Sequence, residues 1–288
     1  MGKKILKALG IILTVAFVAT VLFFVNAIFG NPVSAFLADK GAQKYLEQHY
    51  AETDFYIDRV SFDFKSTNYH AFIKSPTSID SSFSLTMGMN GKVWYDTYED
   101  RVLNFHNTSQ RISGQYRAAV DSVIENKSFP YNAHIAFGDI EFKDSDHPAD
   151  ASMPDYALMR SDLELDADYD IVEFGKKAGH LTIYIYDETV STERLTEILL
   201  KIKELMDKAD IRFYVIDCVL EYEREPEGEI REGRVEVMNF LYSDIYEENL
   251  LERVAKSNED ALTYYDEMDS LKEAEAEALQ NNINETER

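Results

Sequence analysis

The feature that most constrains this chain is an uncharged run from Ala8 to Phe29, 22 residues long. Only Thr14, Thr20 and Asn26 interrupt an otherwise apolar or glycine sequence. At about 1.5 Å of rise per helical residue the run would be roughly 33 Å long, slightly more than the hydrocarbon core of a bilayer. The run therefore predicts a transmembrane anchor, with residues 1–30 forming a short stub and a single membrane-spanning helix.

A cleaved secretory signal is the alternative explanation of this run. Three lysines within the first seven residues suit either interpretation, but the run is longer than the apolar part of a signal peptide. The Gly30-Asn31-Pro32 junction also resembles the start of a new helix, so we favour an uncleaved signal anchor. The positive-inside rule then predicts a single-pass protein of the cell membrane, with a cytoplasmic N-terminus and an extracytoplasmic bulk. Lys40 and Lys44 weaken this charge asymmetry and leave the inverted, cytoplasmic arrangement open.

The charge of the chain excludes one broad class of partner. The formal net charge is −24, and the first thirty residues contribute three lysines and no acid, so the remainder carries −27. Such an acidic surface repels phosphate backbones and anionic lipid headgroups, so nucleic acid is not expected as a partner. The one cysteine, Cys218, lies in an apolar run and predicts a buried, inert thiol.

Residues 31–142 predict a membrane-proximal α+β domain. Asn31 suits an N-cap and Pro32 the first helical position, so a helix should run to about Tyr50. Four segments with period-two alternation then predict strands, and Asn90-Gly91 predicts the last hairpin turn. The expected fold is a helix on a four-stranded antiparallel meander. A further helix and strand complete the domain, over 101–126 and 133–142.

Residues 143–155, rich in acids and prolines, predict a linker, and 156–256 a second, distal α+β domain. The long helix capped by Ser191 has apolar residues at helical spacing and separates strands, which predicts an open sandwich nearest to a ferredoxin-like fold. The acidic tail, 257–288, predicts a helix that begins with a capping box at Ser257. We favour a solvated tail over a partner-binding one.

Residues of the first domain resemble a known family. They include Gly30-Asn31-Pro32-Val33-Ser34, Tyr45-Leu46, Val60 to Lys65, Tyr69 and Ser75-Pro76-Thr77-Ser78 with Asp80 and Phe83. Together they look like the YfjL-like family, over the anchor and most of the first domain to about residue 125. Phe62-Asp63 departs mildly from the family pattern. The resemblance implies a membrane-anchored bacterial protein of unknown function and implies no reaction.

No motif for catalysis, cofactor binding or metal binding was found, so no residue is predicted in these roles and no cofactor is expected. The six histidines show no paired ligand spacing, and hydrolase and nucleotide-binding fingerprints are absent from the sequence. The acid ladder Asp162, Glu164, Asp166, Asp168, Asp170 imitates the start of a calcium loop. It has Ile171 where such a loop needs glycine, so a strand with a wet acidic face is favoured and calcium binding stays open.

The sequence therefore favours a non-catalytic binding, sensing or inhibitory module of the bacterial cell envelope. Its expected partner is a protein or cell-wall component near the membrane surface. The alternative is a cell-envelope hydrolase whose site is assembled from scattered acids. Aromatic residues of the first domain should be core, with Trp94 the exception that could line a groove for sugars or peptides.

Overall fold

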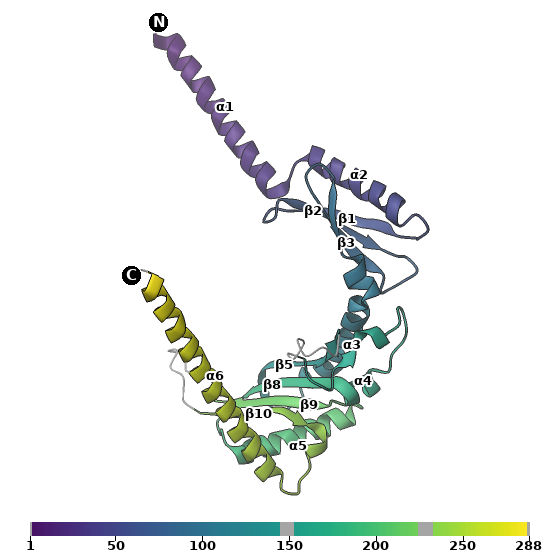
Figure 1. Ribbon diagram of the computed structural model, residues 1–288, viewed down its shortest axis with the longest axis vertical. Helices are drawn as coiled ribbons and strands as arrows, with labels where there is room; N and C mark the ends of the chain where they lie inside the picture. The colour runs from purple at the N-terminus through teal and green to yellow at the C-terminus, as the bar shows by residue number, and fades with distance from the viewer. Residues whose placement is uncertain (1, 145–152, 224–232, 287–288) are drawn as a thin grey trace. The chain divides into compact units, whose positions relative to one another are not determined.

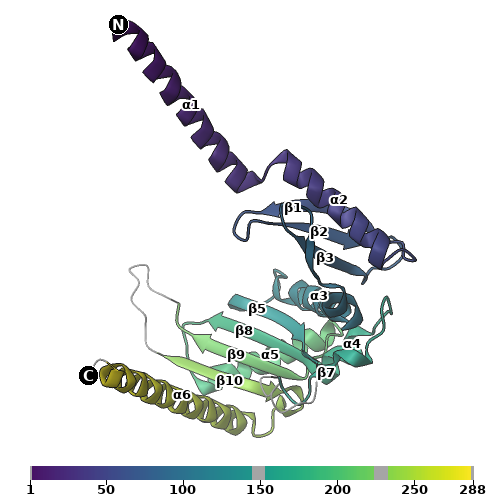
Figure 2. The same ribbon diagram turned by 45° about the horizontal axis from the view of Figure 1, so that its top comes forward.

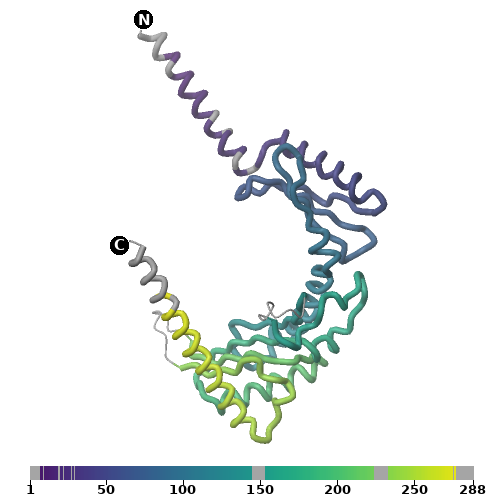
Figure 3. The backbone as a smooth tube through the Cα atoms, viewed as in Figure 1, coloured from purple at the N-terminus to yellow at the C-terminus, as the bar shows by residue number. Residues whose placement is uncertain are grey.

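The computed structural model describes residues 2–144, 153–223 and 233–286. The fold is mixed α+β, as the sequence predicts, and contains two four-stranded sheets (Figure 1). The chain divides into two compact units. Unit 1 holds residues 1–109 together with 160–167, and unit 2 holds 110–159 and 168–288. The path of the backbone, followed in Figure 3, therefore leaves unit 1, enters unit 2, and returns briefly to unit 1.

Helix α1 (Gly2–Phe29) contains the apolar run, and most of its described side chains are exposed. The predicted transmembrane span is nevertheless wrong. In the part of the chain that the structure describes, no helix combines the length and apolar character needed to cross a membrane. The single-pass cell-membrane location, the signal anchor and the extracytoplasmic orientation are corrected with it, because they all rested on Ala8 to Phe29.

Unit 1 is the helix on an antiparallel meander that the sequence predicts. Helix α2 (Pro32–His49) begins as expected, because the Asn31 side chain accepts a hydrogen bond of 2.9 Å from the Ser34 N–H. Its buried face carries Ala38, Ala42 and Leu46, which pack on the sheet. The sheet has the order β1-β2-β3-β4, with every neighbouring pair antiparallel. Its strands are β1 (Tyr56–Asp63), β2 (Asn68–Lys74), β3 (Ser82–Met87) and β4 (Val93–Asp96).

Two glycines let helix α2 approach the β3–β4 turn. A Cβ built on Gly41 would lie 2.0 Å from the Gly91 carbonyl oxygen, and one on Gly91 would lie 2.1 Å from the Leu37 carbonyl oxygen. Gly91 also has φ +75°, a conformation that side chains disfavour. Gly91 therefore has two roles. It lies in the predicted hairpin connection, and its lack of a side chain lets α2 pack against it.

The second predicted helix is shorter than expected and is preceded by a π-helical turn (Glu99–Leu103). Helix α3 itself covers His106–Ile124. Strand β5 (Asn132–Ile140) was assigned to the first domain from sequence, but it pairs with β8 in the second sheet. Part of the predicted linker, 145–152, lies outside the described residues. Its flanks form a short parallel pair, β6 (Phe142–Lys143) and β7 (Leu158–Met159).

Unit 2 is built on a mixed sheet in the order β10-β9-β8-β5, with α5 against one face and α6 beside β10 (Figure 2). Strands β8 and β9 are adjacent and parallel, joined through α5, whereas a ferredoxin-like sheet inserts another strand between such a pair. Ser191 caps α5 as predicted. The elements are α4 (Ile171–Ala178), β8 (Gly179–Tyr186), α5 (Thr192–Lys208), β9 (Val215–Glu221), β10 (Arg234–Leu241) and α6 (Leu250–Thr286).

The Tyr116 ring organises the core where α3, α4 and the sheet of unit 2 meet. It is fully buried, and its hydroxyl donates a 2.8 Å hydrogen bond to the Arg212 carbonyl oxygen. A Cβ on Gly138, Gly175 or Gly179 would lie 2.9 Å or less from an atom of this side chain. Three glycines from separate elements thus make room for one tyrosine, and burial raises the pKa of its phenol.

Helix α6 begins at Leu250, seven residues before the predicted cap at Ser257. Asn249, immediately before the helix, has a left-handed backbone (φ 54°). Arg253 holds the entry to the helix, because its guanidinium donates to the carbonyl oxygens of Asp244, Tyr246 and Glu248 at 2.8–3.1 Å. The predicted start at Ser257 is therefore wrong, and the helix begins one turn before Arg253, whose guanidinium contacts these carbonyl oxygens of the preceding turn.

Candidate functional site

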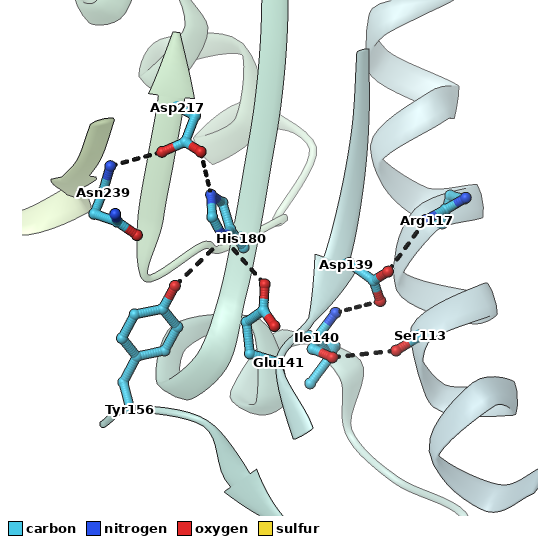
Figure 4. A network of polar contacts seen from close by, with 9 residues as sticks. All are labelled: Ser113, Arg117, Asp139, Ile140, Glu141, Tyr156, His180, Asp217 and Asn239. Carbon is cyan, nitrogen blue, oxygen red and sulfur yellow. Dashed lines mark hydrogen bonds and ion pairs between the residues drawn. The ribbon is translucent and has the colours of Figure 1, made fainter. Parts of the chain in front are cut away.

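The most concentrated polar site of unit 2 surrounds His180, at the start of β8. Alternation along β8 buries Leu181, Ile183 and Ile185 on the face toward the helices and turns His180 to the other face. Asp217 is the only charged residue in the interior of the apolar strand β9, and it lies on the same face as His180. Figure 4 shows these two side chains together with Glu141, which follows β5.

Two carboxylates bracket the His180 ring. The Nδ1 atom lies 3.1 Å from Glu141 Oε1, and the Nε2 atom lies 3.0 Å from Asp217 Oδ2. The Nε2 contact is an ion pair without good hydrogen-bond alignment. The Tyr156 hydroxyl is 3.3 Å from Nδ1. The other Asp217 oxygen accepts a 2.6 Å hydrogen bond from the Asn239 N–H, at a bulge in β10 where Asn239 has φ 49° (Figure 4).

This environment keeps His180 protonated. Burial by itself lowers the pKa of the imidazole, but the polar contacts with Asp217 and Glu141 and the negative charges of these two side chains outweigh it and raise the pKa to about 9. Burial, followed by the charges of Glu141 and Asp217, raises the pKa of the Tyr156 phenol. At neutral pH the His180 imidazole is therefore protonated and the Tyr156 phenol is neutral.

The geometry limits what this cluster can do chemically. A general base needs an unprotonated nitrogen that faces its substrate, and both nitrogens of His180 already face carboxylates. The same imidazole occupies the space between the two acids, where a metal ion would have to bind. Within the described residues, no three His, Cys, Asp or Glu side chains converge as metal ligands. The cluster links β8, β9, the bulge of β10 and the Tyr156 segment.

The acid ladder has a different structure from the one predicted. Residues 160–162 form a 3-10 turn, and the chain from 163 to 170 is irregular, so the predicted strand is wrong. Asp166 (φ 59°) belongs to unit 1, where its Oδ1 accepts from the Asp80 N–H and the Ser78 hydroxyl, both at 3.0 Å. Asp80, almost fully buried, accepts in return from the Asp166 N–H and the Thr108 hydroxyl, both at 2.9 Å.

The ladder is therefore split between several roles. Asp166 closes a clamp with Asp80, and Asp170 caps α4 by accepting from the Val172 and Glu173 N–H groups. Asp166 and Asp170, which belong to one regular pattern in the sequence, thus make different contacts in the fold. The pairing of Asp166 with Asp80 could not be predicted from a local sequence pattern, since the two residues are far apart in the chain.

Two further residues singled out from the sequence differ in exposure. Cys218 is fully buried, and burial together with the nearby Asp217 charge raises the pKa of its thiol to about 12, so it is a poor nucleophile. Trp94 is 61% exposed and lies against Gly88 on the first sheet. The prediction that these aromatic residues are core with Trp94 as the exception holds only in part, because Tyr69 and Phe83 are buried but Phe64 and Tyr95 are exposed like Trp94.

A groove between β10 and α6 is the other prominent feature of unit 2. Its volume is about 680 Å³. Its lining residues include Met238 to Leu241 from β10 and, from α6, Ala261 and Tyr264. Asn258 fixes the helix to the strand edge, because its Oδ1 accepts a 2.9 Å hydrogen bond from the Glu236 N–H. Two acids and two bases also line the groove: Asp244, Asp260, Arg253 and Lys256.

Comparison with protein families assigns both halves of the chain. Residues 5–97 match the YfjL-like N-terminal domain, and residues 115–255 match the YfjL-like C-terminal domain. The chain belongs to the YfjL-like family. Membership thus extends beyond residue 125, where the resemblance in the sequence ended. The His180 cluster lies within the YfjL-like C-terminal domain, whereas the groove is lined half by residues of this range and half by α6 residues beyond 255. Comparison with curated proteins and with solved structures finds no match.

Proposed function

We propose that this YfjL-like protein is a non-catalytic binding module and that it binds a protein partner through the groove between β10 and α6. The observation that carries the proposal is the groove itself, which is 680 Å³ in volume. Its lining is half apolar or aromatic, a composition typical of sites that take up side chains of a ligand. The residues of this kind are Met238, Phe240, Leu241, Ala261, Tyr264 and Tyr265.

The His180 cluster supports the non-catalytic part of the proposal. It is the arrangement in unit 2 that most resembles a catalytic centre, yet both of its imidazole nitrogens are engaged by Glu141 and Asp217. A raised pKa of about 9 keeps the ring from acting as a base near neutral pH. Nucleic acid is a poor partner for the groove, since the chain as a whole carries a net charge of −24.

Site-specific photocrosslinking of the full chain tests the proposal. A photoreactive amino acid is placed at Met238 or Tyr264, both in the groove, or at Lys176 on the exposed side of α4 as the matched control. We expect discrete crosslinked species in cells from the two groove positions and not from Lys176. Absence of crosslinking at the groove, or the same species from all three positions, would overturn the proposal.

A further inference from the structure

Helix α6 carries one apolar seam that starts in the fold and continues beyond the groove. Leu250, Val254 and Ala261 are buried against the rest of unit 2. The same alternation of three and four residues continues through Tyr264, Met268 and Leu271. Tyr264 is 57% exposed and Leu271 is 59% exposed. Residues at this spacing share one side of a helix, so the seam emerges from the domain, interrupted once where Ser257 and Asn258 stand between Val254 and Ala261.

The views in Figures 1 and 2 agree on how α6 runs. Its first turns lie beside β10, and its later turns extend past the end of the sheet. The exposed part of the seam therefore begins at the groove, where Tyr264 is a lining residue of both surfaces. An apolar seam with a 3–4 spacing is the surface with which one helix packs against another. This favours a helix over an extended strand as the segment that would bind to the seam.

Charge indicates which kind of helix would pack there. Between residues 261 and 274 the chain has four acids, Asp266, Glu267, Asp269 and Glu273, against the single base Lys272. Asp260 and Glu267 directly precede the seam residues Ala261 and Met268, so they flank the seam along the same edge of the helix, and Asp260 already pairs with Lys256 at 3.1 Å. Two copies of this helix would bring like charges together, whereas a basic helix would complement them.

We infer that the groove and the exposed seam of α6 together bind a positively charged amphipathic helix of a partner protein. This inference rests on the proposed function and specifies the chemistry of the partner. Apolar side chains of the bound helix would fill the groove and cover Tyr264, Met268 and Leu271. Lysine or arginine residues on its flanks would face Asp260 and Glu267. The mode is the helix-in-groove recognition used by many binding domains.

A designed peptide tests the inference on the full chain. The probe is an 18-residue amphipathic helix of leucine and lysine, compared with a scrambled peptide of the same composition and with an analogue that has glutamate in place of lysine. Affinity is measured by fluorescence anisotropy at low and moderate salt. We expect the amphipathic probe to bind at least tenfold more tightly than either comparison peptide, with weaker binding as salt rises.

Paired variants locate the binding surface. Met268→Ser with Leu271→Ser should weaken binding of the amphipathic probe at least tenfold. Thr263→Ala with Ser270→Ala, on another side of the same helix, should change it less than twofold. Circular dichroism and hydrogen exchange confirm that both proteins remain folded. Equal binding of the scrambled peptide, or no effect of the seam variant, would overturn the inference.

Two further outcomes separate this inference from the proposed function. If the groove positions crosslink a partner in cells but the basic probe does not bind, the inference fails and the proposed function stands. If neither groove crosslinking nor probe binding is observed, both fail. Sedimentation of the full chain tests self-association directly. A dimer that the Met268→Ser, Leu271→Ser variant disrupts would assign the seam to a second copy and overturn the basic-helix partner.

Discussion

In unit 1 a helix approaches its sheet closely enough for Gly41 to contact Gly91, whereas in unit 2 the Tyr116 ring fills the space that three glycines leave. The polar clusters of the two units differ in the same way. Unit 1 buries Asp80 in a set of hydrogen bonds with Asp166 and Thr108. Unit 2 half-buries His180 between opposite charges. Unit 1 thus depends on close backbone contact and neutral donors, and unit 2 on a filled core and ion pairs.

The first test of this comparison, and the largest expected effect, is Gly41→Ala. The new methyl group would lie 2.0 Å from the Gly91 carbonyl oxygen, so helix α2 must move away from its sheet. We expect a loss of about 3 kcal/mol or more in the stability of unit 1. Hydrogen exchange of the full chain should show faster exchange in β1 to β4 and little change in the sheet of unit 2.

Gly114→Ala is the matched control for this substitution. Gly114 is also helical, but a Cβ there meets no atom within 4 Å. Alanine at this position should be neutral or slightly stabilising, because it favours the helix. An unchanged melting temperature for Gly41→Ala would show that α2 does not pack on the turn as described.

The second test removes the charge from the core of the polar cluster in unit 2, by His180→Gln. The folded-state pKa of about 9 exceeds the ordinary value of 6.5, so the stabilisation by this group is fully present below pH 6.5 and is lost as pH rises through 9. Below pH 6.5 the variant should therefore be less stable by up to about 3 kcal/mol. The difference between the two proteins should shrink between pH 6.5 and 9.

Denaturant unfolding at several pH values measures this effect, with a spectroscopic probe in unit 2 to report the unfolding of that unit. His49→Gln is the control, since that histidine is stacked on Tyr45 in unit 1 and not held between two carboxylates like His180 among the described residues. A constant difference between wild type and His180→Gln across this pH range would contradict the ion-pair description.

The third test is Asp80→Ala, which should destabilise unit 1 by about 2 kcal/mol. The Thr108 hydroxyl and the Asp166 N–H would each lose a buried acceptor. Asp168→Ala, at an exposed position of the same acid ladder, should have almost no effect. Thermal melting of both variants, with and without calcium, also tests the remaining possibility of a calcium site. Calcium-dependent stabilisation that Asp168→Ala abolishes would show that the ladder binds the ion.

The smallest expected effect on stability belongs to the double variant Met268→Ser, Leu271→Ser. These side chains lie at or beyond the end of the folded core, so unfolding should change by no more than about 0.5 kcal/mol. Chemical denaturation checks this expectation. A larger loss would show that the exposed seam is part of the fold of unit 2, and the surface would then no longer be free for a partner.

Local sequence patterns predicted much of the fold because the forces that set them are local. Asn31 and Ser191 cap helices as expected, and Gly91 has the positive φ expected in the β3–β4 turn, since each of these choices depends on a few neighbouring residues. The placement of β5 could not be predicted in this way. Its alternation indicates a strand but does not indicate which sheet supplies its hydrogen-bonding neighbour.

The candidate site shows the same division. The phase of β8 predicts that His180 points away from the apolar face, and an aspartate inside the apolar strand β9 was a visible signal that sequence reasoning did not use. That Glu141 and Asp217 meet the same imidazole depends on the parallel pairing of β8 with β9 and on the edge position of β5. Strand order is a property of the whole sheet, so spacing along the chain cannot give it.

The return of residues 160–167 to unit 1 has a consequence for synthesis of the protein. The first 109 residues cannot complete their unit as they emerge, because Asp166 has not yet been made. Roughly 60 further residues must be added, which takes about 3 to 12 s at ordinary translation rates. During that interval Asp80 has no Asp166 to clamp it, and a nascent chain stalled before residue 166 should be more sensitive to proteases in unit 1 than one stalled after 167.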